Sequence, residues 1–207
     1  MKNLKMIFLA IGCMAAVSLT SCLKSDDDNN DNGLSQAEIS ECFAAVRGSY
    51  TGKLVYETRN VQSPTDTVDV SWNVGSDTLL VLRPFPANAV ASQINDVNLK
   101  KAVEGTDYLS ELKCYLGFYK YDTNVMFYIA PMKVEFPIFY KNATHTLSVY
   151  FWSSAYSYGY KNTKTGDMEA QLVMAAAYLD DDENTNYLNS STSALVSIPV
   201  IFSNVIK

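Results

Sequence analysis

Apolar and polar residues alternate along most of the chain after residue 48, in short runs separated by turn residues. A period of two is typical of β-strands that bury one face. The pattern predicts strands over 49–58, 67–74, 78–83, 109–121, 125–132, 133–140, 146–160 and 194–206. Pro137 is expected to interrupt the sixth of them. Tight turns at 75–77 and 122–124 join neighbouring strands, so we expect antiparallel pairing rather than helical crossovers.

Three segments depart from this alternation. Ser35 and Glu38 match a capping box, and apolar residues recur at helical spacing over 39–46, which predicts a short amphipathic helix. Residues 88–101 predict either a short helix or a helical turn followed by a loop. Met168–Leu179 is rich in helix-favouring residues, but it follows a hairpin-like turn after a long strand. We therefore predict a strand for this last segment.

Together these elements predict a mainly β fold with one N-terminal amphipathic helix, either an antiparallel up-and-down barrel or a two-layer sandwich. Residues 34–207 suffice for a single β-rich domain. The segment Gly48-Ser49-Tyr50-Thr51-Gly52-Lys53-Leu54 resembles the start of the first strand in lipocalin-like (calycin-type) lipoprotein domains of unknown function. The resemblance implies a barrel, although the interruption at 84–101 departs from a simple meander.

The first 21 residues have the pattern of a secretory signal peptide. Lys2 and Lys5 precede an apolar run over 6–17, which is shorter than the roughly 20 residues needed to span a bilayer. Leu19-Thr20-Ser21-Cys22 resembles the lipobox of bacterial lipoproteins. That resemblance implies that Cys22 becomes the first mature residue and carries acyl chains such as palmitate. An ordinary apolar N-terminus that contains a cysteine is the alternative.

An acidic stretch over 22–33 follows, rich in Asp and Asn, and is expected to be a flexible tether because it has little to bury. It resembles the export signal of surface lipoproteins in Bacteroidota-type outer membranes. The resemblance implies a lipid-anchored protein of the outer membrane that faces the outside of the cell. A plain spacer is the alternative reading of the same residues.

The charge and the cysteines limit the partners and the redox state. The chain has 16 basic and 22 acidic residues, and removal of 1–21 with two lysines leaves 14 against 22, a net charge of −8. An acidic domain without a basic stripe argues against nucleic acid as a partner. Cys42 and Cys114 remain after Cys13 and Cys22 are assigned to the N-terminal segment. An exported protein permits a disulfide between them, and two buried free thiols are the equal alternative.

Residues that commonly carry catalysis are sparse. His145 is the single histidine, and the chain has no Gly-x-Ser-x-Gly elbow, phosphate-binding glycine loop or zinc-like Cys/His spacing. Asp180, Asp182 and Asn184 match the first three ligand positions of an EF-hand loop, but the glycine and closing glutamate positions do not match. We therefore expect a solvated acidic loop, no metal or cofactor, and a protein that is not an enzyme.

Aromatic residues are the feature that points towards a function. One face of the predicted strand 146–160 carries five of them: Tyr150, Trp152, Tyr156, Tyr158 and Tyr160. Another strand adds Tyr115, Tyr119 and Tyr121. Such rings suit stacking on sugars or lining a ligand site, and in a β-rich protein they can also form one wall of the core. The sequence indicates a binding module for an extracellular small molecule or glycan, or alternatively an accessory subunit that docks on another outer-membrane protein.

Overall fold

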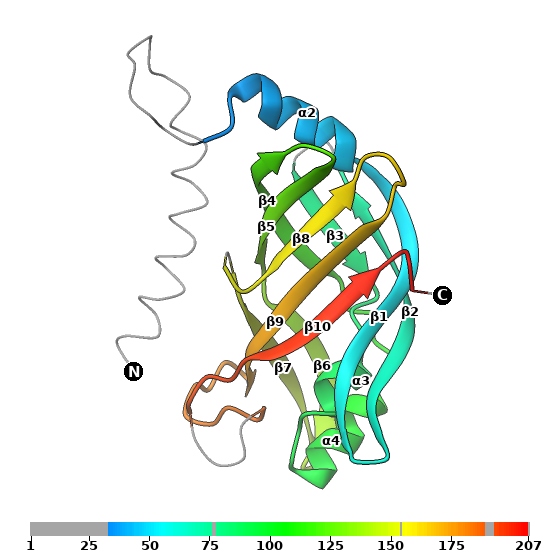
Figure 1. The fold of residues 1–207 in the computed structure, drawn as a ribbon. Helices are drawn as coiled ribbons and strands as arrows, with labels where there is room; N and C mark the ends of the chain where they lie inside the picture. The colour runs from blue at the N-terminus through cyan, green and yellow to red at the C-terminus, as the bar shows by residue number, and fades with distance from the viewer. Residues whose placement is uncertain (1–32, 76–77, 154, 189–192, 207) are drawn as a thin grey trace.

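The computed structural model describes residues 33–75, 78–153, 155–188 and 193–206. Within them the chain forms three helices and ten strands (Figure 1). The helices are α2 (Gln36–Val46), α3 (Ala87–Ala91) and α4 (Val97–Glu104). The strands are β1 (Gly48–Asn60), β2 (Ser63–Val74), β3 (Leu79–Arg83), β4 (Leu112–Tyr121), β5 (Asn124–Pro131), β6 (Val134–Tyr140), β7 (Ala143–Trp152), β8 (Tyr158–Asn162), β9 (Met168–Leu179) and β10 (Ile198–Ser203). The predicted signal peptide over 1–21, Cys22 and nearly all of the tether lie outside the described residues.

Eight of these strands close into an antiparallel ring. Neighbours pair in the order β1, β2, β3, β4, β5, β8, β9 and β10, and β10 pairs back to β1. At the closure Phe202 of β10 lies opposite Leu54 of β1 on one side and Ala170 of β9 on the other. The prediction of a mainly β, antiparallel fold with an N-terminal helix is confirmed. Of the two predicted architectures, the chain adopts the barrel.

The hairpin of β6 and β7 branches from this ring. Two strands share one edge of β9: β8 pairs with residues 168–171 and β7 pairs with residues 173–179. Where β7 begins to pair in place of β8, Trp152 lies opposite Val173. The prediction of one strand over 146–160 is therefore wrong, because the chain turns between Trp152 and Tyr158. Buried Ser157 makes this turn possible: its hydroxyl donates to the Trp152 carbonyl and accepts the backbone N–H of Val173. A side chain thus replaces the ladder hydrogen bonds that a continuous strand would have made.

Other element boundaries also differ from prediction. The β1–β2 hairpin is longer, with only Val61 and Gln62 between its strands, and the final strand is shorter than 194–206. Residues 88–101 take part in two short helices, α3 and the first half of α4, with residues 92–96 as the turn between them, rather than in a single short helix or helical turn. Pro137 does not interrupt β6, because β6 has only β7 as a strand partner. The Pro137 carbonyl accepts the Thr106 hydroxyl at the free edge, so the missing N–H of proline removes no ladder bond.

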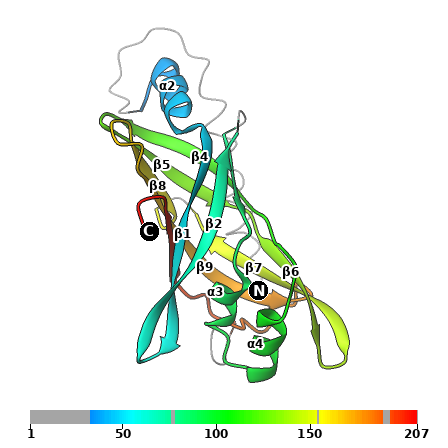
Figure 2. The same cartoon turned by 90° about the vertical axis from the view of Figure 1, so that its right-hand side faces the viewer.

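Helices cover the two ends of the barrel, as Figures 1 and 2 show. α2 lies across one end and buries Cys42 and Val46, and its predicted capping box is formed, with the Ser35 N–H donating to Glu38 at 2.8 Å. At the other end α3 and α4 lie between the two projecting hairpins, β1–β2 and β6–β7. Asp96 caps α4 and also accepts the Tyr140 hydroxyl of β6 at 2.8 Å, which ties this helix to the branch hairpin.

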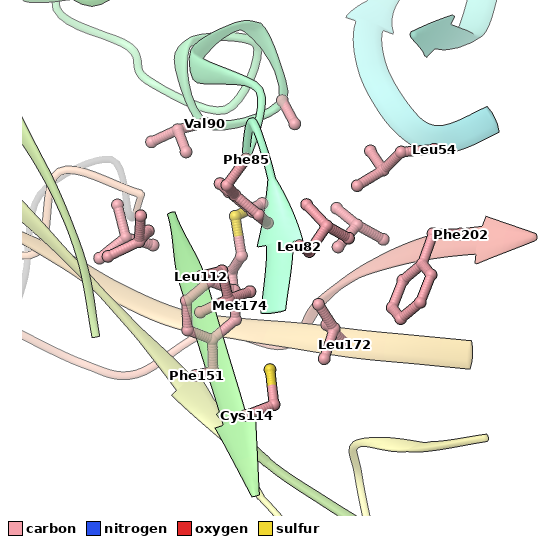
Figure 3. Close-up of a cluster of buried hydrophobic side chains, with 14 of the residues drawn as sticks. Leu54, Leu82, Phe85, Val90, Leu112, Cys114, Phe151, Leu172, Met174 and Phe202 are labelled. Carbon is pink, nitrogen blue, oxygen red and sulfur yellow. The ribbon is translucent and has the colours of Figure 1, made fainter. Parts of the chain in front are cut away.

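The core fills the barrel and continues under α3 and the branch hairpin. Figure 3 shows how strands far apart in sequence contribute to it, with Leu82 and Leu112 beside Met174 and Leu172. Phe85 continues this core and meets Phe151 edge-on at 5.5 Å between ring centroids. Burial of this much apolar surface is the main stabilising term for such a domain. Among the described residues, no helix is long and apolar enough to cross a bilayer.

Candidate functional site

Inward side chains of the barrel strands leave little room for a ligand inside. They are buried almost completely, and they include Leu54, Trp72, Leu82, Cys114, Phe127, Leu172 and Phe202. Several hollows formed by the described residues lie on the surface. One groove of about 580 Å³ runs between the β1–β2 hairpin and the helices α3 and α4, with Tyr56, Arg59 and Asp66 in its polar wall. A filled interior favours the outer wall of the barrel as the recognition surface.

The outer wall of β4, β5 and β8 carries a group of tyrosines, which we name the tyrosine face: Tyr115, Tyr119, Tyr128, Tyr158 and Tyr160. Tyr115, Tyr128 and Tyr158 lie on three neighbouring strands and are 49%, 42% and 42% exposed. Tyr128 pairs with Gly117 on one side and with Tyr158 on the other. Since neighbouring strands are about 4.8 Å apart, these rings form a band across the sheet.

A β-bulge places one ring of this face. The pairing of β4 with β5 shifts register between Phe118 and Lys120, so Tyr119 is the extra residue of β4. Its ring stacks on Tyr128 with the centroids 4.2 Å apart and the planes at 23°. Burial raises the pKa of Tyr119, and the neighbouring Tyr128 and Tyr158 raise it further. A bulge commonly changes the direction of a side chain in this way, and here it adds the Tyr119 ring to the aromatic surface beside Tyr128.

Charged residues lie both within and beside the tyrosine face: exposed Lys120 of β4 pairs with Met126, the strand partner of Tyr160. Tyr160 pairs with Met126 on one side and with Glu169 on the other. Burial raises the pKa of Tyr160, and Glu169 and Asp167 raise it further, so the β9 border is acidic. Between the borders the face offers ring surfaces and phenol hydroxyls, which can stack on a ligand and can donate or accept hydrogen bonds.

Trp152 and Tyr156 extend the aromatic surface beyond β8. Their ring centroids are 5.4 Å apart, and the Trp152 indole N–H donates to the Val196 carbonyl at 2.7 Å. The Gln171 side chain donates to the Tyr156 carbonyl at 3.1 Å and lies opposite Tyr158 in the ladder. Tyr156 remains largely exposed, and Trp152 is held half-buried.

Two of the sequence-predicted tyrosines lie away from this surface. The Tyr150 hydroxyl donates to Asp181 at 3.1 Å, its ring packs against Tyr178, and burial is the first cause that raises its pKa to about 12. Tyr121 faces Glu41 of α2, which raises the Tyr121 pKa. Of the predicted aromatic set, Tyr158 and Tyr160 therefore join Tyr115 and Tyr119, while Tyr150 and Tyr121 have separate surroundings.

Sequence reasoning did not single out the tyrosine at the centre of the face. Tyr128 lies within the predicted strand 125–132, where it alternates with buried Phe127 and Ile129. The available signal was the tight turn after Tyr121, because folding the two strands back on each other brings Tyr128 beside Gly117 and Tyr119.

The lone histidine and the acidic loop make local contacts with each other. His145 Nδ1 is 2.7 Å from Asp180 Oδ2, and Asp180 also accepts the Thr146 N–H at 2.9 Å. That backbone N–H is the main cause of a lowered pKa for Asp180. Asp182 accepts both the backbone and the side-chain N–H of Asn184. In the part of the chain that the structure describes, no group of three or more His, Cys, Asp or Glu residues could hold a metal ion.

Cys42 and Cys114 are both free and buried, so of the two alternatives the structure has the pair of thiols. Cys42 lies on α2 above the barrel end, whereas Cys114 points into the barrel from β4 beside Leu80 of β3. Burial raises the pKa of Cys42 to about 11 and raises that of Cys114 as well. Both side chains therefore act as small core residues rather than as reactive thiolates.

A sequence model of a protein family covers the barrel wall that carries these tyrosines. The model is that of DUF4840, a domain of unknown function, and it matches residues 45–179, from the end of α2 to the end of β9. No curated protein and no solved structure matches the chain. Since the matched span is more than half of the 207 residues and includes the whole tyrosine face, the chain belongs to the DUF4840 family.

Proposed function

We propose that this protein is a lipid-anchored cell-surface module that binds an extracellular glycan through the tyrosine face. The observation that carries the proposal is the set of exposed rings on three neighbouring outer strands, with Tyr128 at their centre. Flat rings with hydroxyl groups suit sugars, which present apolar C–H faces and many hydroxyls. The filled interior makes an enclosed small-molecule site the weaker alternative within the same binding role.

The anchor in this proposal is Cys22, acylated after removal of residues 1–21 and inserted in the outer membrane. It rests on the lipobox-like Leu19-Thr20-Ser21-Cys22 and on the acidic stretch of surface lipoproteins that it resembles. Stable anchoring takes more than one acyl chain, at about 0.8 kcal/mol for each buried CH₂ group. The lipocalin-like relationship is part of the same proposal and is supported by the up-and-down order of the ring strands.

The anchor has a direct test. We expect cells fed an alkyne-tagged fatty acid to label the protein, and Cys22→Ser to abolish the label, because this thiol is the proposed acylation site. Protease added to intact cells should digest the wild-type domain if it faces outwards. Fatty-acid labelling of the Cys22→Ser variant would disprove the anchor at Cys22. A domain that resists protease on intact cells and is digested only after cell lysis would face the inside of the outer membrane.

The glycan-binding role predicts a loss of affinity when the central rings are removed. For the mature lipoprotein in detergent, the double variant Tyr128→Ala/Tyr158→Ala should bind polysaccharides about tenfold or more weakly, since each lost aromatic contact costs about 1 kcal/mol. Affinity electrophoresis in gels that contain single polysaccharides measures this. Phe139→Ala is the matched control, because Phe139 is an exposed ring on β6, outside the tyrosine face. Equal losses in the control and the double variant, or no binding to any polysaccharide, would refute the role.

Docking on another outer-membrane protein is the second candidate function. It is favoured by exposed apolar side chains on β6 and on the segment before β4: Phe139 and Leu109 are 67% and 77% exposed, and Tyr108 and Met132 line a groove with charged neighbours. Large apolar side chains that remain exposed in this way are typical of partner interfaces. Cross-linking on cells distinguishes the two candidates: a protein partner captured through this area in wild type and lost in Leu109→Ser would support docking.

A further inference from the structure

The tyrosine face contains a recess at Gly117, in the middle of β4. A Cβ atom added at this glycine would meet no atom within 4 Å, so the space above its backbone is open. Tyr115 and Tyr119 flank Gly117 along the strand, and Tyr128 lies opposite it. The rings of the face therefore leave open space on the β4 side, above the peptide backbone of Gly117.

The ring beside this recess is held in place. Tyr119, the extra residue of the bulge, stacks on Tyr128, and these two rings support each other at 4.2 Å. Tyr158 lies on the far side of Tyr128, on the next strand. From β4 across β5 to β8, the surface thus presents the open space at Gly117, the ring of Tyr128 and the ring of Tyr158. Since each step between strands is about 4.8 Å, the span from the recess to Tyr158 is about 10 Å, comparable to two linked pyranose rings.

The charges around the face disfavour an anionic ligand. Carboxylate or sulfate groups are usually held by Arg or by clustered Lys side chains. Lys113, at one end of β4, is already paired with Glu111 at 3.4 Å. The opposite border has Glu169 and Asp167, whose charges raise the pKa of Tyr160. Lys161, which follows Tyr160 on β8, donates to the Tyr50 hydroxyl at 2.7 Å. Lys120 follows Tyr119 on β4, and no arginine lies among the residues of β4, β5 and β8.

We propose that the ligand is an uncharged glycan chain that runs across β4, β5 and β8, with one sugar seated over Gly117 and the next stacked on Tyr128. This inference rests on the proposed function and specifies its ligand class and its orientation. Gly117 then determines specificity, because a side chain at this position would occupy the space of the first sugar. The acidic border adds discrimination against uronic acids and sulfated sugars.

The test fills the recess and varies the charge of the ligand. Gly117→Val places a strand-favouring side chain in open space, so the fold should be kept, and thermal unfolding of the full mature lipoprotein checks this. Thr67→Val is the matched control, an exposed strand position on β2 outside the face. The probes are dextran, mannan and xylan, each beside a sulfated derivative of the same polymer. We expect binding of at least one neutral polymer, little dependence on salt, and a loss of about tenfold or more in Gly117→Val.

Each outcome decides the inference separately from the proposed function. Stronger, salt-sensitive binding of the sulfated polymers would overturn the neutral ligand, even if Tyr128→Ala/Tyr158→Ala still weakened binding and so upheld the glycan role. Affinity of Gly117→Val within twofold of wild type would overturn the recess as a subsite. The ligand class and its placement would both be supported by one result: Gly117→Val unfolds at the wild-type temperature but loses affinity for the neutral polymer, whereas Thr67→Val keeps that affinity.

Discussion

Replacing Gly52 with alanine is expected to destabilise the protein by about 3 kcal/mol, because overpacking against rigid backbone lies at the upper end of the usual cost. Gly52 lies in β1 where β10 crosses to close the ring. A Cβ atom there would collide with the carbonyl oxygen of Ser203 and would lie 2.7 Å from its carbonyl carbon. It would also lie 2.8 Å from the Cα of Asn204, so the end of β10 would have to move away from β1.

The measurement is chemical denaturation of the full mature chain, followed by tryptophan fluorescence because Trp72 lies on neighbouring β2. Thermal unfolding should shift down by roughly 6–12 °C for a domain of this size. Gly117→Ala is the matched control: it makes the same chemical change in a strand, but at a position with no atom within 4 Å. A Gly52→Ala variant as stable as the control would mean that β10 does not close the barrel at this point.

Replacing Asn186 with alanine should cost about 3 kcal/mol as well, since an unpaired buried polar group costs about 1–3 kcal/mol. Asn186 is fully buried after β9, and its side chain makes four hydrogen bonds to backbone. The oxygen accepts the N–H groups of Ala177 and Leu188, both at 3.0 Å. The amide nitrogen donates to the carbonyls of Ala175 at 3.2 Å and Ala194 at 2.8 Å. One side chain therefore joins the segment between β9 and β10 to the edge of β9, at residues that lie beyond the first pair of β10 with β9.

Asn184→Ala is the control for this prediction, because Asn184 is exposed and its side chain bonds only to Asp182 in the described contacts. Surface changes of that kind usually stay within about 0.5 kcal/mol. Hydrogen exchange provides the second readout: the Ala177 amide should lose protection in Asn186→Ala, since its acceptor is gone. Unchanged protection of that amide would show that another group accepts it and that the side chain is dispensable.

The acidic loop illustrates how a motif read from sequence can take a local role. The spacing of Asp180, Asp182 and Asn184 matches part of an EF-hand, but Asp180 accepts the Thr146 N–H and Asp182 accepts N–H groups of Asn184. Asp180 and Asp181 also have left-handed backbone angles, with φ of 51° and 57°. Short polar side chains suit such a conformation. The composition of the loop is thus explained by the sharp turn out of β9 and by its contacts with β7.

Local patterns in the sequence determined the type of most elements. The alternation of apolar residues predicted the strands, and the Ser35 and Glu38 pair predicted the start of α2, because both signals depend on neighbours within a few residues. Met168–Leu179 was predicted as a strand from its position after a turn, and it is one. Its own alternation is lost towards the end because the second half is buried on both faces.

Only the tertiary structure decided between barrel and sandwich, and it alone assembled the tyrosine face. Ring closure depends on β10 pairing with β1, two segments at opposite ends of the domain, which no local pattern specifies. Similarly, Tyr158 meets Tyr128 only because Ser157 turns the chain from β7 into β8 at the right register. Local propensity acts over a few residues, whereas strand register and ring closure arise because all strands bury one shared core. For this reason the sequence predicted single strands, and only the tertiary structure brought the tyrosines of three strands together.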